Sequence, residues 1–239
     1  MEEITLSFFV PCFNEENNIT KTLNDIKEGA QHINYEVLVA DDASEDKTIE
    51  MVENFKKNNP NENIKIFRNK SNKGIGFNFW ETAHKASGKY YMTVSGDACL
   101  PANEIKKIVN NIGKADMILT YFRDKRGIFR RIISKTFSFI INLITLNNLK
   151  YYNGPNIYLV EDIKLCHSRR YGFGYHAELI SAQIRQKKTY IEIEVATTLR
   201  SSGTSKALKP SNVLSVIGSI ISIFLNQIIY TIKKILKIK

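Results

Sequence analysis

The chain has 239 residues, of which 43% are hydrophobic and 24% charged, so it can bury one sizeable core and is not a disordered protein. Its net charge of +10 favours anionic partners, which include nucleic acid, phosphorylated small molecules and acidic lipid headgroups. Cys12, Cys99 and Cys166 lack the close pairing typical of zinc sites and disulfide frameworks, and are predicted to be reduced core thiols.

Strand and helix patterns alternate along the first 94 residues. Residues 1–4 carry no basic region and lead straight into an apolar stretch, so no cleaved signal peptide is expected and the domain is expected in the cytosol. The patterns predict strands at 4–10, 35–40, 64–69 and 90–94, and helices at 19–29, at 48–57 and up to Ala86. Such alternation favours a mainly parallel sheet with helices on its faces.

The loops that follow these strands are unusually polar. They comprise residues 11–16, 41–46, 72–76 and 95–98. Open α/β sheets bind ligands at the carboxyl ends of their strands, so these loops are where we expect the chemistry. The alternative is that they are ordinary caps and turns, because Asn, Asp and Ser satisfy helix N-termini wherever they occur.

Taken in order, these loops and a later basic segment at 200–206 resemble the inverting family 2 glycosyltransferases. Within that family they are most similar to polyprenyl-phosphate sugar synthases such as dolichyl-phosphate mannose synthase. The resemblance spans residues 4–207. It implies a GT-A fold, Rossmann-like with a mainly parallel sheet, over 1–208, including an expected membrane-docking region at 127–149. Residues 209–239 would then form a C-terminal membrane-associated amphipathic helix.

The resemblance implies a nucleotide-sugar site and a divalent cation. Asp97 is the expected ligand of Mg²⁺ or Mn²⁺, because these ions prefer hard oxygen donors and take much of their shell from phosphates and waters. Ser95 and Ala98 stand where the family often has further Asp residues, so metal binding by one carboxylate should be weaker; a turn-capping Asp97 is the alternative. The expected nucleotide-sugar residues are Pro11, Phe13, Glu15, Asp42, Lys73, Gly74 and Asp97, with Asp41 supporting its loop.

Two further basic groups match positions that bind phosphates in the family. Arg200, Ser205 and Lys206 would cover the diphosphate of the donor, since guanidinium, hydroxyl and ammonium groups suit phosphate oxygens. Arg123 and Arg131 would face the phosphate of the acceptor. The alternatives are a solvated basic loop and a surface charge run.

The acceptor depends on the region around His176. Members that glycosylate hydroxyls carry an acidic general base near this position, and an alcohol needs such a base, whereas an ionised phosphate does not. His176 is therefore predicted to be either a catalytic base or a hydrogen-bonded structural residue, with both left open. Glu178 would orient the sugar or cap a helix.

Two apolar helices are predicted to contact a membrane. Residues 213–232 carry no charge, and polar side chains recur along one side, followed by lysines. We interpret this segment as an interfacial helix; the alternatives are a spanning helix and a helix packed on a partner. Residues 128–146 have a broad apolar face beside Arg130, Arg131 and Lys135, and a buried core helix is the alternative there.

The predicted function is transfer of a sugar, with inversion, from a UDP- or GDP-sugar to a lipid-linked acceptor at the cytoplasmic side of the cell membrane, and the expected acceptor is polyprenyl phosphate. The first alternative is a transferase acting on a hydroxyl of a cell-surface glycan. The second is a catalytically degenerate, nucleotide-binding membrane scaffold, suggested by Ser95 and Ala98. Nucleic-acid binding is disfavoured, because the lysines cluster with apolar helix faces and no nucleic-acid motif occurs.

Overall fold

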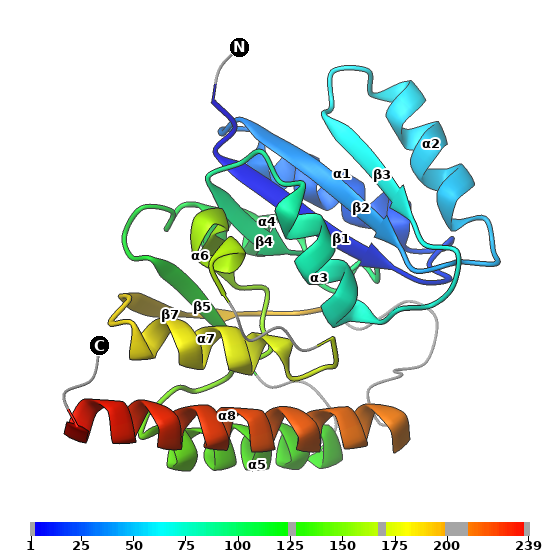
Figure 1. Ribbon diagram of the computed structural model, residues 1–239. Helices are drawn as coiled ribbons and strands as arrows, with labels where there is room; N and C mark the ends of the chain where they lie inside the picture. Colours follow the sequence, from blue (N-terminus) through cyan, green and yellow to red (C-terminus); the bar gives the residue numbers. More distant parts are fainter. Residues whose placement is uncertain (1–2, 124–127, 167–170, 199–209, 237–239) are drawn as a thin grey trace.

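The computed structural model describes residues 3–123, 128–166, 171–198 and 210–236. A seven-stranded sheet in the order β3-β2-β1-β4-β6-β5-β7 forms its centre (Figure 1). β6 runs antiparallel to both of its neighbours, and the other pairings are parallel. The strands are β1 (Leu6–Cys12), β2 (Tyr35–Asp41), β3 (Ile64–Arg68), β4 (Tyr90–Thr93), β5 (Met117–Phe122), β6 (Ile157–Leu159) and β7 (Tyr190–Val195).

Helices cover both faces of this sheet. Leu6, Phe8 and Val10 of β1 point to one face, where α1, α2 and α4 complete the core, and Phe9 points to the other, where α3, α6 and α7 pack. This is the period of two that a strand buried on both sides requires. The helices are α1 (Ile19–Ala30), α2 (Thr48–Asn58), α3 (Ile75–His84), α4 (Ala102–Val109), α6 (Val160–Lys164) and α7 (Tyr175–Arg185).

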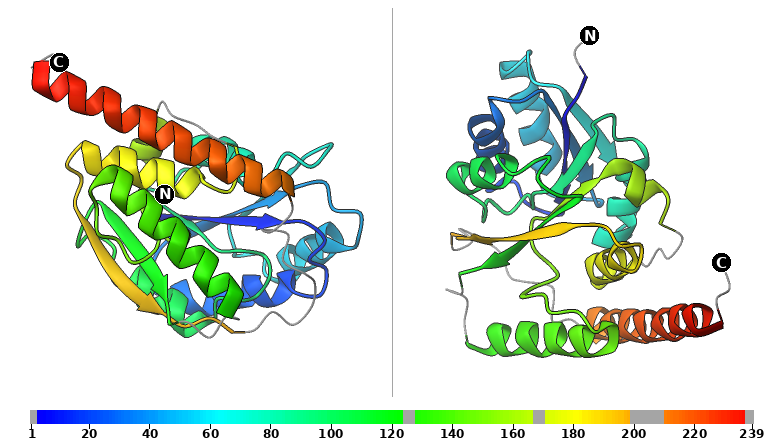
Figure 2. Two further views of the ribbon diagram at one scale, coloured as in Figure 1. Left: turned by 90° about the horizontal axis from the view of Figure 1, so that it is seen from below. Right: turned by 90° about the vertical axis from the view of Figure 1, so that its left-hand side faces the viewer.

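Two long helices form an extra layer beyond α7. They are α5 (Ile128–Thr145) and α8 (Pro210–Leu236), and they lie side by side along one flat side of the molecule (Figure 2). Each sends few side chains into the body; Ile141 of α5 and Ile223 of α8 are buried against the α7 side of the core. The remainder of both helices is largely exposed on the side that faces away from the sheet.

The predicted fold class is confirmed, and the ends of the predicted strands and helices up to β4 differ from the observed ones by at most two residues. The predicted division at residue 208 stays a prediction. Cys12 and Cys166 are buried and outside any disulfide, as expected, whereas Cys99 is half-buried.

Candidate functional site

The loops after β1 and β2 are tied to each other by reciprocal hydrogen bonds. The backbone N–H of Asn14 donates to Ser44 Oγ at 2.9 Å, and the N–H of Glu45 donates to Asn14 Oδ1 at 2.9 Å. The N–H of Glu15 donates to Thr48 Oγ1 at 2.8 Å. Asn14 adopts a left-handed conformation (φ 56°), which Asn tolerates better than most residues. The two loops therefore form one rigid wall at the carboxyl edge of the sheet.

Asp42, directly after β2, organises the loop that leads into α3. Its Oδ1 accepts the backbone N–H of Lys73 at 2.8 Å, and its Oδ2 accepts the N–H of Gly74 at 2.9 Å. Asn69 Nδ2 donates to Oδ1 at 2.9 Å. Gly74 has a φ of +87°, which favours glycine. The predicted nucleotide residues Asp42, Lys73 and Gly74 are thus in direct contact.

Asp41 supports this arrangement from within, as predicted. Its carboxylate accepts the N–H of Ser44 and pairs with Arg68 Nε at 3.2 Å. Among the other nucleotide candidates, Pro11 near the end of β1 and Phe13 in the following loop are half-buried. Glu15 is buried, and its Oε2 accepts a hydrogen bond from Asn18 at 2.7 Å.

The loop that carries Asp97 lies against the end of β1. The N–H of Gly96 donates to Pro11 O at 3.0 Å, and the N–H of Ala98 donates to Thr22 Oγ1 at 3.0 Å. Asp97 is half-buried, and its Oδ1 accepts the N–H of Cys99 at 3.3 Å. Thr22 was missed by sequence reasoning, because a threonine within a helix pattern carries no signal of a contact 76 residues away.

A divalent cation fits the Asp97 loop only when it is shared with a substrate. In the described part of the chain, no three His, Cys, Asp or Glu side chains are grouped closely enough to hold a metal. Asp97 offers one carboxylate, and the neighbouring Ser95 is exposed. Mg²⁺ is commonly bound through one or two carboxylates and substrate phosphates, so this donor set suits a cation bridging Asp97 and a diphosphate.

The predicted phosphate-binding residues are only partly visible. Arg200, Ser205 and Lys206 lie outside the described residues. Thr198, two residues before Arg200, donates its N–H to Cys99 O at 3.0 Å, so the described chain leads from β7 to the Asp97 loop.

The two arginines expected at the acceptor phosphate lie on different elements. Arg123, at the end of β5, is exposed and pairs with Glu194 of β7, with Nε and Oε1 2.6 Å apart. Arg131 is half-buried on α5. Their role at an acceptor stays a prediction.

His176 lies in an aromatic cluster. It is 3% exposed, its Nδ1 is 2.7 Å from Tyr158 Oη, and its ring packs on those of Tyr158, Tyr175 and Phe79. Burial lowers the pKa of His176 to about 3. The ring is therefore neutral at neutral pH and a weak base, and of the two roles left open this environment supports the structural one. Glu178, two residues further along α7, is also buried.

This depressed pKa makes a prediction about stability. Below the ordinary histidine pKa of 6.5, the unfolded chain binds a proton at His176 and the native state does not, so stability falls as the pH drops from 6.5 toward 3. At pH 5 the expected cost is about 2 kcal/mol relative to pH 7. His176→Gln should remove this share of the pH dependence in denaturant unfolding. If the free energy of unfolding changed with pH in the same way in both proteins, a buried neutral imidazole would be contradicted.

The polar side chains that recur along α8, including Ser215 and Ser219, form a polar stripe that faces the protein instead of water. Ser219 is fully buried, and Ser215 Oγ accepts the N–H of Phe173 at 3.2 Å. Arg185 of α7 lies within electrostatic range of Tyr230 of α8. Gly174, at the start of α7, lies against Ser219, and α7 and α8 run in the same direction (Figure 1).

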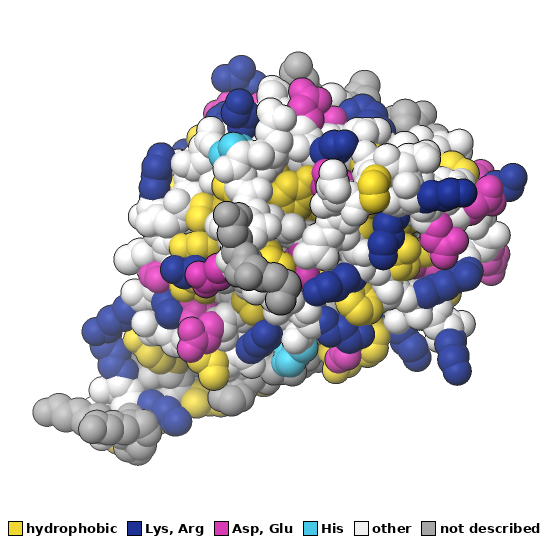
Figure 3. Space-filling view, turned by 90° about the horizontal axis from the view of Figure 1, so that it is seen from above, with side chains coloured by type: hydrophobic (Ala, Val, Ile, Leu, Met, Phe, Trp, Pro, Cys, Tyr) yellow, Lys and Arg dark blue, Asp and Glu magenta, His cyan; other side chains and the backbone are white. Residues whose placement is uncertain are grey.

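The apolar sides of α5 and α8 consequently point outward. We call the following exposed side chains the apolar face: Ile132, Ile133, Phe139 and Leu143 of α5, Leu146 directly after α5, and Leu214, Ile217, Ile221, Phe224, Leu225, Ile228, Ile229, Ile232, Ile235 and Leu236 of α8. By length and composition alone, Leu214–Leu236 could cross a membrane, with a mean hydropathy of 1.7. The opposite side of the molecule carries charges of both signs across it (Figure 3).

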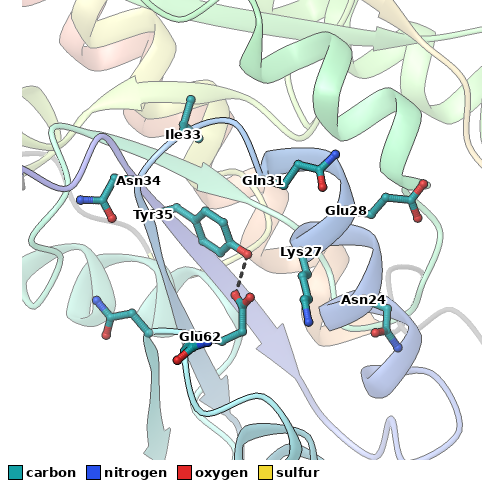
Figure 4. A pocket seen from close by; sticks show the side chains of 10 residues that line it. Asn24, Lys27, Glu28, Gln31, Ile33, Asn34, Tyr35 and Glu62 are labelled. Atoms are coloured by element: carbon teal, nitrogen blue, oxygen red, sulfur yellow. Dashed lines mark hydrogen bonds between the residues drawn. The ribbon is translucent and has the colours of Figure 1, made fainter.

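One hollow lies away from these loops. Its volume is about 730 Å³, and it is found at the amino ends of β2 and β3, where Tyr35 donates to Glu62 at 2.6 Å (Figure 4). Amide side chains such as Asn24, Gln31 and Asn34 line it. Because parallel sheets place their ligands at the carboxyl ends of strands, this hollow is not the predicted nucleotide site.

Comparison with known proteins finds one matching family model and several relatives. A family model described as glycosyl transferase family 2 matches residues 7–166. A dolichol-phosphate mannosyltransferase of Pyrococcus furiosus is 26% identical over 157 residues, covering 63% of this chain and 44% of that protein. An undecaprenyl-phosphate 4-deoxy-4-formamido-L-arabinose transferase of Photorhabdus laumondii is 26% identical, covering 91% of this chain and 73% of that protein. The chain spans 32%, 44% and 52% of the length of three curated relatives that it matches.

Solved structures share the fold. Glucosyl-3-phosphoglycerate synthase from Mycobacterium tuberculosis, in complex with Mn²⁺, UDP and phosphoglyceric acid, superposes with a TM-score of 0.72. The match covers 92% of this chain and 78% of that one, at 14% sequence identity. At this identity the likeness establishes the architecture alone.

Proposed function

Because the chain belongs to glycosyl transferase family 2, we propose that it transfers a sugar from a nucleoside-diphosphate sugar to a lipid-linked acceptor, with inversion at the anomeric carbon. The family resemblance predicted from the polar loops is thereby confirmed. The acceptor in our proposal is a polyprenyl phosphate, the substrate class named for several relatives. The observation that carries the proposal is that one molecule has both the polar loops at the carboxyl ends of its strands, which we assign to the donor, and the apolar face.

Each polar loop has one role in this reaction. The wall formed by the loops after β1 and β2, with Asp42 and the backbone of Lys73 and Gly74, would bind the nucleotide. Asp97 would hold Mg²⁺ or Mn²⁺ together with the diphosphate of the donor. When bound, such a cation supplies positive charge next to the departing diphosphate. Arg200, Ser205 and Lys206 would cover the same phosphates.

Inversion follows from a single displacement. An oxygen of the acceptor forms a bond to the anomeric carbon while the bond to the diphosphate oxygen breaks, and both electrons of that bond leave with the nucleoside diphosphate. A phosphate acceptor is already ionised and needs no base, whereas an alcohol must lose a proton. The low pKa of His176 and its burial support the phosphate acceptor.

The apolar face supports a membrane-attached enzyme. α5 and α8 lie in one layer (Figure 2). Their apolar side chains are exposed, and α8 keeps its polar stripe against the protein, where Ser219 is buried and Ser215 accepts the N–H of Phe173. A helix standing across the bilayer would have to leave this polar contact, so we propose that both helices lie in the interfacial plane, on the cytoplasmic side. Lys233 and Lys234 at the end of α8 would meet anionic headgroups.

The acceptor can be tested with purified protein, Mn²⁺ and a panel of UDP- and GDP-sugars, offered with polyprenyl phosphate or with a polyprenyl alcohol in vesicles. We expect nucleotide release only with the phosphate, and His176→Gln should keep more than about half of the wild-type turnover at pH 7.5, since no base is needed. Release with the alcohol, lost in His176→Gln, would instead favour a hydroxyl acceptor. Release with neither acceptor from any donor would overturn the proposal.

A further inference from the structure

Residues 171–174 contact both α8 and the start of α3, which follows the loop bound to Asp42 that we assign to the donor. On one side, the backbone of Tyr171 lies so close to Gly76 that a Cβ there would be 2.5 Å from the carbonyl carbon and oxygen of Tyr171. The ring of Tyr171 also packs edge to face on Phe77, with centroids 5.4 Å apart. Gly76 and Phe77 are in the first turn of α3, directly after Gly74, whose N–H is bonded to Asp42.

On its other side, the same segment is seated on α8. A Cβ at Gly172 would lie 1.6 Å from Ser215 Oγ, and a Cβ at Gly174 would lie 2.3 Å from Ser219 Cβ. The N–H of Phe173, between the two glycines, donates to Ser215 Oγ at 3.2 Å. Both glycines thus allow α8 to approach at a distance that no other residue type would permit.

We infer that α8 is a positioning element of the donor site, and that Ser215 and Ser219 set segment 171–174, which in turn sets the Asp42-bound loop before α3. The inference rests on the proposed function, because it assigns that loop to the donor nucleotide. The coupling runs through packed backbone, which has little freedom to absorb a displacement. The helix that bears the apolar face therefore also determines how well the donor is held.

Gly174 and Ser219 allow a test with a built-in rescue. Gly174 has a φ of −84°, so Gly174→Ala causes no backbone strain and acts only by pushing on Ser219. With Ser219→Gly in addition, the nearest remaining atom is Ser219 Cα at 3.8 Å, an ordinary contact. Within the described residues, Ser219 Oγ has no hydrogen-bond partner, so this second change sacrifices no hydrogen bond.

The measurement is binding of UDP and GDP with Mn²⁺ by calorimetric titration on the full chain, together with the donor KM and kcat. Gly174→Ala should weaken nucleotide binding and raise the donor KM about 3- to 30-fold while changing kcat less. The Gly174→Ala/Ser219→Gly double variant should regain most of the lost affinity. A purely structural defect would reduce the active fraction, and therefore kcat, at an unchanged KM.

Four outcomes decide whether the inference holds. Recovery of nucleotide affinity in the double variant supports the inference, whereas effects that simply add overturn it. If the wild type binds nucleotide and Gly174→Ala binds it equally well, the inference alone is overturned. If the wild type binds neither UDP nor GDP, the proposed function is overturned as well. If Gly174→Ala does not fold, Gly172→Ala with and without Ser215→Gly applies the same logic, because only Ser215 Cα at 3.7 Å remains near that Cβ.

Discussion

Asp97→Ala is expected to lower kcat about 10²- to 10³-fold, the loss typical when one preorganised group that stabilises developing charge is removed. The substituted loop should keep its shape, because its backbone is held through Gly96 and Ala98 and not through the carboxylate alone. Thermal shift with a nucleotide sugar, with and without Mn²⁺, measures the binding side of the effect. Stabilisation that depends on metal in the wild type should disappear in the variant.

Ser95→Asp is the counterpart of Asp97→Ala, because it adds a carboxylate to the same loop instead of removing one. Ser95 is exposed and stands two residues before Asp97, so a second carboxylate there can approach the same cation. We expect Mn²⁺ to be bound more tightly by Ser95→Asp than by the wild type. If donor binding were indifferent to metal in all three proteins, the degenerate scaffold would replace the transferase as the better account.

Membrane attachment is expected to fail when the apolar face is made polar. Phe139 and Leu143 are each 66% exposed on α5, and Ile221 and Ile229 are about half exposed on α8. Changing all four to Ser should weaken partitioning onto vesicles about 10³-fold, since each apolar side chain contributes roughly 1 kcal/mol. Sedimentation with vesicles measures this, and the free energy of unfolding should change little because these side chains point away from the core.

A charge variant separates the two parts of this attachment. Lys233→Gln with Lys234→Gln should weaken binding to anionic vesicles by about 1 kcal/mol per lysine, and the loss should vanish at high salt or on neutral vesicles. Binding of the four-fold Ser variant at the wild-type level would argue that another molecule, and not a membrane, covers the apolar face.

The loops that we propose for the donor could be recognised in the sequence because their signals are local. A strand followed by Pro11, Phe13 and Glu15, or by Asp41 and Asp42, can be recognised from a few consecutive residues, and parallel strands bring such loops to one edge. The part of the site expected to bind the acceptor was harder to predict from the sequence. His176 left two roles open, and its burial beside Tyr158 and Phe79 depends on strands and helices far apart in the chain.

The sequence by itself determined the order of strands and helices up to β4, the polar loops at these strand ends and the two apolar helices, because hydropathy period and turn chemistry act over a few residues. Only the tertiary structure decided which way each surface points. The stripe on α8 predicts a helix with one polar side, and packing against α7 turns that side inward. Likewise, Gly172 and Gly174 look like ordinary loop glycines until α8 lies on them. Such contacts join residues about 45 positions apart, and no local pattern encodes them.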